Sequence, residues 1–413
     1  MSSHEIPAVH DDLEANWAPL RRSSPDSGAP NVPSLPIRLL LTLVTSVALL
    51  LTLLVVIPFC VAQYITLGPP LKWQPLQTYL GGRLVYWSGR LSDAAFLRPP
   101  PPTGKVPGNL PLRWAKEGRA GVSVEVVELP LVQESMLRGM GNAGGVKPER
   151  RPGFLLIPEG STGRGLNQAK EKEKVILYFH GGAYGGGQPV KFPFPWQMAK
   201  ALNARLLGVQ YRLCLSADSA FPAPLLDALA GYLYLTRTLH FDPPDIILLG
   251  DSSGAHLALT LSRYLSDLGL CQPGYVALSS PLGDCGRSMP SRWKLSGVDI
   301  LASNMDAKPL RSALRHYTPQ ALDHPYFAPA KAAPSDWEYL RVAGVKVYVM
   351  IGTKEILMDD GFAIVKAMQE AKVDVELRED PEGNHCGAMA QWKGSSAWEV
   401  WVRDLRRLVG IDA

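Results

Sequence analysis

Cysteine is scarce in this sequence, with five residues in a chain of 413. No two of them form a CxxC pair and none lies in a Cys/His cluster, so a zinc ribbon and a disulfide scaffold are both excluded. A disulfide between Cys271 and Cys285 stays open, although buried free thiols are the expected state. Cysteine usage therefore does not settle the redox compartment.

Charge is also sparse. Charged residues make up 19% of the chain, the net charge is +4, and no run of Lys or Arg is longer than two. Nucleic acid is therefore not expected as a partner. The sequence has no Asn-x-Ser/Thr acceptor, so it offers no glycosylation evidence for a lumenal location. Hydrophobic residues reach 46%, which is enough for a large core and excludes a wholly disordered chain.

One window contains no charge at all. Leu39–Ala62 holds 24 residues, broken only by four hydroxyl side chains. A helix of that length spans roughly 36 Å, more than the ~30 Å hydrocarbon core of a bilayer. A buried core helix is rarely so uniformly apolar, and the segment is too long and too far from the N-terminus for a signal peptide. We predict a transmembrane helix.

The orientation of this helix rests on a small charge difference. Arg21, Arg22 and Arg38 precede it, whereas Lys72 and Arg83 are the nearest positive residues after it. The positive-inside rule then favours a cytosolic N-terminus. We expect a single-pass membrane protein of the endoplasmic reticulum with the domain that follows the helix on the lumenal side.

The segment after the anchor has a helical repeat. Leu76, Leu80, Leu84, Trp87 and Leu91 lie on one helical face, although the Gly81-Gly82 pair indicates two short helices rather than one. This helical face could pack on the main domain or lie against the membrane, and the sequence leaves both open. Pro99–Pro102 follows as a stiff linker.

Four segments follow from these patterns. They are a disordered tail (1–38), a transmembrane helix (39–62), juxtamembrane helices with a Pro-rich linker (63–118) and the main domain (119–413), which carries a lid insertion at about 286–342.

From residue 120 onwards, candidate strands alternate with candidate helices. The strands are expected at 122–131, 154–158, 175–179, 205–211, 246–249, 275–278, 345–351 and 373–378. The helices are expected at 194–202, 225–236, 255–268, 361–371 and 397–408. This alternation predicts an α/β fold with a mostly parallel sheet covered by helices on both faces.

A candidate nucleophile lies between the fifth strand and the helix after it. Gly250-Asp251-Ser252-Ser253-Gly254 matches G-x-S-x-G, in which a tight strand-to-helix turn projects the serine out of the sheet. The alternative is a glycine-rich turn with a structural serine. The turn lies directly before a helix N-terminus, where a developing negative charge is favoured, and this position supports Ser252 as the nucleophile.

A serine hydroxyl needs a base, and the base needs an orienting acid. In hydrolases with this turn the chain order is serine, acid, histidine, so His385 is the candidate base among eight histidines. A surface loop histidine is the alternative. Glu355 is preferred as the acid because it directly follows a strand, whereas Asp359 and Asp360 are better placed to cap the next helix.

A glycine-rich run follows the third strand at His180–Gly187. Glycines let backbone N–H groups approach a developing oxyanion. The run lacks the Lys-Ser/Thr ending of a phosphate loop and the spacing of a dinucleotide fingerprint. His180 is expected to hold this loop in place rather than act as a base. No metal and no cofactor are predicted.

Together these motifs resemble the hormone-sensitive-lipase branch of the α/β-hydrolases, over about Val175 to Leu408. The shared stretches are His180–Ala183, Gln210–Leu213, Phe221–Pro224, Asp227-Ala228 and the turn at Ser252. The chain departs from the usual pattern with Glu355-Ile356-Leu357 where the branch has an aspartate before Pro-Leu, and with Ser253 where alanine is common.

The glutamate and the preceding anchor look like the membrane-anchored, steryl-acetate-hydrolase-type members known from fungi. The resemblance implies an α/β-hydrolase fold with Ser252, Glu355 and His385 as the catalytic triad. It also implies oxyanion donors from the backbone of Gly181, Gly182 and Ser253.

The sequence thus predicts a membrane-anchored serine carboxylic ester hydrolase that uses an acyl-enzyme intermediate. Because of the anchor, its substrates are expected to be small lipophilic esters such as steryl or terpenoid acetates or acylglycerols. Two alternatives stay open. One is a tailoring hydrolase or acyltransferase of lipophilic natural-product biosynthesis, and the other is a non-catalytic ligand-binding protein on the same fold. The sequence does not indicate an oligomeric state.

Overall fold

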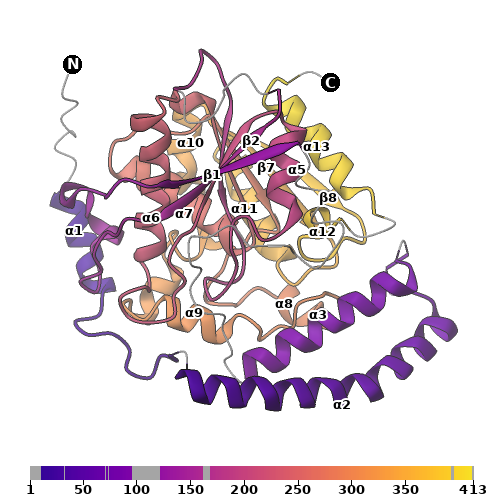
Figure 1. Cartoon of the computed structure of the whole chain (residues 1–413). Coiled ribbons are helices and arrows are strands. Elements are labelled where there is room, and N and C mark those ends of the chain that lie inside the picture. Colours follow the sequence, from indigo (N-terminus) through magenta and orange to yellow (C-terminus); the bar gives the residue numbers. More distant parts are fainter. Residues whose placement is uncertain are drawn as a thin grey trace.

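The computed structural model describes residues 11–31, 33–69, 71–72, 74–94, 121–160, 168–391 and 395–411. The first ten residues of the predicted tail and the Pro99–Pro102 linker lie outside the described residues. Within the described part, an eight-stranded sheet forms the centre of the molecule, in the order β1-β2-β4-β3-β5-β6-β7-β8 (Figure 1).

The strands are β1 (Val122–Glu128), β2 (Pro152–Pro158), β3 (Val175–Phe179), β4 (Arg205–Val209), β5 (Ile246–Asp251), β6 (Tyr275–Ser279), β7 (Lys346–Gly352) and β8 (Asp374–Asp380). β1 and β2 pair antiparallel with each other, and β2 pairs antiparallel with β4. All other neighbours are parallel. The predicted α/β fold with a mostly parallel sheet is confirmed.

Helices cover both faces of this sheet. They are α5 (Pro193–Ala201), α6 (Ala223–Leu233) with its π-helical extension η4 (Tyr234–Thr238), α7 (Ser253–Asp267), α11 (Met358–Glu370) and α13 (Ala397–Leu408). β3 shows why the core has two halves. Leu177 and Phe179 pack with α6, α7 and α11, whereas Ile176 and Tyr178 point to the opposite face and pack with α5 and α13. Such a strand is buried on both sides, which explains its continuous apolar run.

The region predicted as an irregular lid contains short helices and no strand in the described chain. These are α8 (Ser291–Lys294), α9 (Ala307–Ala313), η6 (Pro319–Asp323), η7 (Pro329–Lys331), η8 (Pro334–Trp337) and α10 (Glu338–Ala343). Cys271 and Cys285 are both free thiols. Cys271 is exposed rather than buried as expected, because it lies in the loop between α7 and β6.

The prediction of a disordered tail is wrong for residues 11–31. These residues form α1 (Asp11–Trp17), η1 (Ala18–Leu20) and a bridge from Arg21 to Tyr317. The Trp17 side chain is only 2% exposed. It is held by ring contacts with four aromatic side chains of the lid: Tyr317, His324, Tyr326 and Phe327. The partners lie about 300 residues away, so no local pattern in the tail could indicate them.

The predicted membrane segment is part of a longer helix, α2 (Leu35–Leu67). Among the described helices, α2 is the one that is long and apolar enough to cross a membrane, by length and composition alone. It extends four residues before the charge-free window because Pro36 is favourable in the first turn and Arg38 is tolerated there. Gly68, with φ of 81°, ends it.

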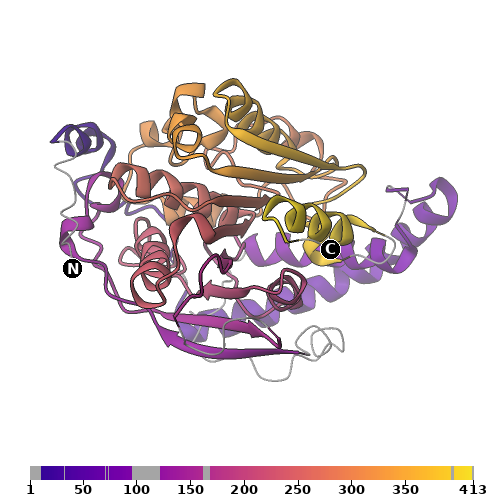
Figure 2. The same ribbon diagram turned by 90° about the horizontal axis from the view of Figure 1, so that it is seen from above.

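A second helix, α3 (Leu76–Ala94), packs along α2 and lies between α2 and the catalytic domain (Figure 1). The expected break at Gly81-Gly82 does not occur. A side chain at Gly82 would lie 3.2 Å from the Ile300 side chain, so the glycine permits close packing against the lid. Figure 2 shows the turn between α2 and α3 projecting beyond the edge of the domain.

Candidate active site

Ser252 lies at the tight turn between β5 and α7. Its φ of 53° and ψ of −120° are strained for a residue with a side chain. Glycine is required on both sides, since a Cβ at Gly250 would clash with Gly254 and a Cβ at Gly254 would clash with the Phe179 carbonyl. The turn is fixed by the Ser252 N–H, which donates to the Ser279 carbonyl at 2.9 Å. The strain is characteristic of a nucleophile held out of the sheet.

The structure brings Glu355 and His385 together. His385 Nδ1 lies 3.2 Å from Glu355 Oε2, and both side chains are buried. The other Glu355 oxygen accepts the Gly352 N–H. The two alternative acids have different partners: Asp359 accepts the Ser291 N–H at 2.7 Å, and Asp360 accepts two backbone N–H groups of the β6–α8 loop.

The surroundings of His385 set its protonation. Burial by itself would lower the pKa of the imidazole, but Cys386 and the Glu355 carboxylate raise it, and the net pKa lies well above its usual value. An anionic partner at Nδ1 stabilises the imidazolium and fixes which nitrogen carries the proton in the neutral ring. The arrangement leaves Nε2 as the atom that can accept a proton from a serine.

Asp299 is a buried carboxylate that sequence reasoning missed. Its Oδ1 accepts the His385 N–H at 3.0 Å, and its Oδ2 accepts the Ile356 N–H at 2.7 Å. One side chain therefore ties the loop of the base to the loop of Glu355. Burial raises the pKa of Asp299 to about 6. It lies in the irregular lid, where no periodicity or spacing singles out a residue.

The glycine-rich loop differs in one respect from what the resemblance implies. The Gly181 N–H donates to Asp251 Oδ2 at 3.0 Å, and Asp251 Oδ1 accepts the Tyr178 hydroxyl at 2.9 Å. Gly181 therefore uses its N–H to hold the loop on the nucleophile turn, and its assignment as an oxyanion donor is wrong. Gly182 and Ala183 follow with φ of 121° and 52°. Successive left-handed residues of this kind often form a concave set of N–H groups.

His180 supports this loop. Its ring stacks on Tyr211 with 4.3 Å between centroids, and its Nδ1 donates to the Gly181 carbonyl at 2.8 Å. Burial lowers the pKa of His180 to about 4, so the ring is neutral at pH 7. These contacts fit a residue that fixes the loop.

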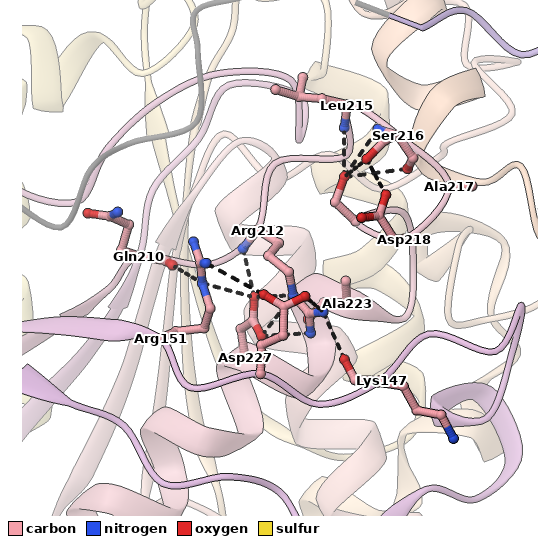
Figure 3. Close-up of polar contacts among 12 residues, drawn as sticks. Lys147, Arg151, Gln210, Arg212, Leu215, Ser216, Ala217, Asp218, Ala223 and Asp227 are labelled. Atoms are coloured by element: carbon pink, nitrogen blue, oxygen red, sulfur yellow. Dashed lines mark hydrogen bonds and ion pairs between the residues drawn. The ribbon is translucent and has the colours of Figure 1, made fainter.

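The stretches Gln210–Leu213 and Asp227-Ala228 meet in a buried ion pair (Figure 3). Arg212 Nη2 donates to Asp227 Oδ1 at 2.9 Å, and the Arg212 N–H donates to Asp227 Oδ2 at 2.7 Å. Arg212 also donates to the Lys147 and Ala223 carbonyls. The pair fixes the chain after β4 against α6, which places Tyr211 under His180. The shared motif here is structural.

A cavity of about 910 Å³ joins these elements. Ser252, His385 and the glycine-rich loop line it, and Phe192 and Met305 contribute apolar walls. Residues of α3 form a further part of the wall. Among the described residues, no group of three or more His, Cys, Asp or Glu side chains is arranged to hold a metal ion.

Comparisons with known proteins agree with this architecture. A family model described as the alpha/beta hydrolase fold matches residues 176–389, just over half of the chain. The protein therefore belongs to the α/β-hydrolase family. It is an ester hydrolase of the esterase and lipase type, as its relatives are.

One relative is an acetyl-hydrolase from Streptomyces hygroscopicus, 28% identical over 235 residues, which cover 57% of this chain and 75% of that protein. Another is carboxylesterase NlhH from Mycobacterium tuberculosis, 27% identical over 219 residues, which cover 51% of this chain and 65% of NlhH, slightly less than two thirds of its length. A hormone-sensitive lipase from a metagenome library has the same fold, with a TM-score of 0.55 at 23% identity over 72% of this chain and 90% of that one. The predicted α/β-hydrolase fold is confirmed.

Proposed function

We propose that the protein is a membrane-associated serine hydrolase of lipophilic carboxylic esters, with Ser252, His385 and Glu355 as its catalytic triad. The observation that carries the proposal is the buried contact of 3.2 Å between Glu355 and His385 beside a cavity that also holds Ser252. The geometric logic of an acid that orients a base next to a strained serine is that of acyl-transfer enzymes.

The steps follow from these positions. Ser252 Oγ attacks the ester carbonyl carbon while His385 Nε2 takes its proton, and Glu355 stabilises the imidazolium. The carbonyl oxygen becomes an oxyanion, and its proposed donors are the backbone N–H groups of Gly182, Ala183 and Ser253. The imidazolium then gives its proton to the departing alcohol. Water hydrolyses the acyl-enzyme with the same base, which regenerates the serine.

The substrate class is argued from the cavity and from α2. The cavity has apolar walls and includes residues of α3, the helix that packs on the long apolar helix α2. Esters that partition into a bilayer fit such a location. The acetyl-hydrolase relative favours acetyl esters, so steryl or terpenoid acetates come before acylglycerols. We propose 286–342 as the lid and the endoplasmic reticulum as the location.

The proposal is tested with purified full-length protein and p-nitrophenyl esters of increasing chain length, alongside a steryl acetate in mixed micelles. We expect a burst of p-nitrophenol in the wild type and none in Ser252→Ala. Ser253→Ala is the matched control, since it retains the backbone N–H and should keep the burst. Absence of a burst in the folded wild type would contradict the triad, and a preference for p-nitrophenyl acetate over the steryl acetate in micelles would contradict the substrate class. Added alcohol that diverts the acyl group would indicate acyl transfer.

A further inference from the structure

The outer surface of α2 is mostly apolar. The helix has 33 residues, roughly 50 Å. Its large apolar side chains that are at least 41% exposed are Leu35, Ile37, Leu39, Leu40, Leu43, Val44, Val47, Leu50, Leu51, Leu54, Val55, Ile57, Phe59, Ile65 and Leu67. A continuous surface of this size is unfavourable in water and needs an apolar partner.

The C-terminal end of α2 is attached to the catalytic domain through α3. Tyr64 stacks on Tyr79, with ring centroids 5.8 Å apart, and its hydroxyl donates to the Gln74 carbonyl at 3.0 Å. On its other side α3 contacts the lid, where Arg83 donates to the Gly297 carbonyl at 3.0 Å. The α2–α3 hairpin is thus one structural unit with the lid.

The N-terminal end of α2 is attached to the same domain. Arg315 donates to the Asn31 side chain and to the Pro30 carbonyl, each at 2.8 Å. Trp17 is buried in the aromatic cluster of the lid. Only three residues separate Asn31 from Leu35, and each can span at most about 3.6 Å. The start of α2 therefore lies close to the domain surface.

These two attachments are incompatible with a single membrane crossing. A crossing helix would place the tail before α2 on one side of the bilayer and the catalytic domain after it on the other. The tail would then lose the Trp17 cluster and the Arg315 contacts, and Trp17 and the apolar side chains around it would be exposed to water.

We propose that α2 lies in the plane of one membrane leaflet, so that the protein is monotopic and both ends of α2 are on the side of the catalytic domain. The partner is the acyl region of that leaflet, which covers the exposed side chains of α2. In-plane helices need no match to the bilayer thickness, which agrees with a helix far longer than a span requires. This inference rests on the membrane attachment in the proposed function and replaces the single-pass topology expected from the charges.

The position of α3 gives this topology a consequence for the substrate. Gln77, Thr78, Gly89 and Ser92 of α3 line the same cavity as Ser252. A lipid ester in the leaflet can therefore reach the serine along α3, without its apolar part crossing water.

The topology is tested with the full chain in sealed vesicles. The protein carries a natural reporter on the catalytic domain, the exposed Cys271. Ser24→Cys adds a second reporter at an exposed position in the tail. A membrane-impermeant maleimide coupled to polyethylene glycol adds one gel shift per accessible thiol.

The monotopic arrangement predicts molecules with either two shifts or none, whatever the mixture of orientations. A single crossing predicts one shift on every molecule, and that result would overturn the inference. Cys271→Ser alone gives the background from the other thiols. Ser24→Cys combined with Cys271→Ser shows which gel shift comes from the tail reporter. Ser27→Cys, also exposed, is a second tail position.

The two proposals fail in different ways. Protein that does not sediment with vesicles would overturn the membrane attachment, and with it both proposals. Same-side labelling of a protein without esterase activity would leave the topology standing and contradict the chemistry. Opposite-side labelling of an active esterase would contradict the topology and leave the chemistry standing.

Discussion

The clearest consequence of the site geometry concerns Asp299, which holds the loops of both Glu355 and His385 without lining the cavity. Asp299→Asn retains one oxygen and replaces the other with an NH₂ group, so one backbone N–H loses its acceptor. An unsatisfied buried N–H costs about 1–3 kcal/mol. If the same free energy is lost from the alignment of the catalytic loops in the transition state, kcat falls by roughly 5- to 150-fold, while KM changes little.

A pH profile separates positioning from a general loss of stability. His385 lowers the pKa of Asp299 by attraction, and this interaction is reciprocal. Removal of the Asp299 charge should therefore lower the pKa of His385. Since the base acts only when neutral, the acid limb of the kcat/KM profile should move to lower pH in Asp299→Asn.

The assay is p-nitrophenyl acetate hydrolysis by the full-length protein between pH 5 and 9, with thermal unfolding measured in parallel. Ser296→Ala is a matched control, because it also removes an acceptor from a lid N–H, that of Ser303, but does not contact the catalytic loops. A folded Asp299→Asn protein with unchanged kcat and an unchanged acid limb would refute the reasoning. A loss of kcat in Asp299→Asn equal to that in Ser296→Ala would also refute the reasoning.

Three further changes have defined outcomes. Glu355→Gln removes the anion that raises the pKa of His385, so the acid limb should move to lower pH and kcat should fall by about 10²–10⁴-fold, which steady-state profiles measure. Arg212→Met removes the closer of two arginines from the buried Asp227 carboxylate, which keeps Arg151 at 3.9 Å, and should cost up to about 3–5 kcal/mol in denaturant unfolding, whereas the double variant with Asp227→Leu should recover most of it. Trp17→Ala should lower the free energy of unfolding by about 3–5 kcal/mol, whereas a disordered tail would give no change.

The inner strands of the sheet, such as β3, β4 and β5, were predictable because they are buried on both faces. Val175–Phe179 is a short run of apolar side chains between polar segments, and the structure has a strand with those bounds. The turn at Ser252 was also predictable, since its glycines meet a local steric requirement that spacing alone reveals. Features set by neighbours in sequence are accessible in this way.

The remaining features depend on distant contacts. Trp17 is buried by residues near position 320, and the Gly181 N–H is taken by a carboxylate 70 residues later in the chain. Asp299 acquires its role only where three loops meet. The charge-free window predicted a long apolar helix, and α2 is long and apolar enough to cross a membrane. The proposed topology depends on how the tail packs, which composition does not encode.

The most direct test of the proposed chemistry is rapid-mixing kinetics of the full-length protein with p-nitrophenyl acetate. A triad built on Ser252 predicts a burst of about one p-nitrophenol per active site, an acetyl group on the peptide that contains Ser252, and neither signal in Ser252→Ala. A stable, folded wild-type protein that shows no burst and carries no acetyl group would contradict the account.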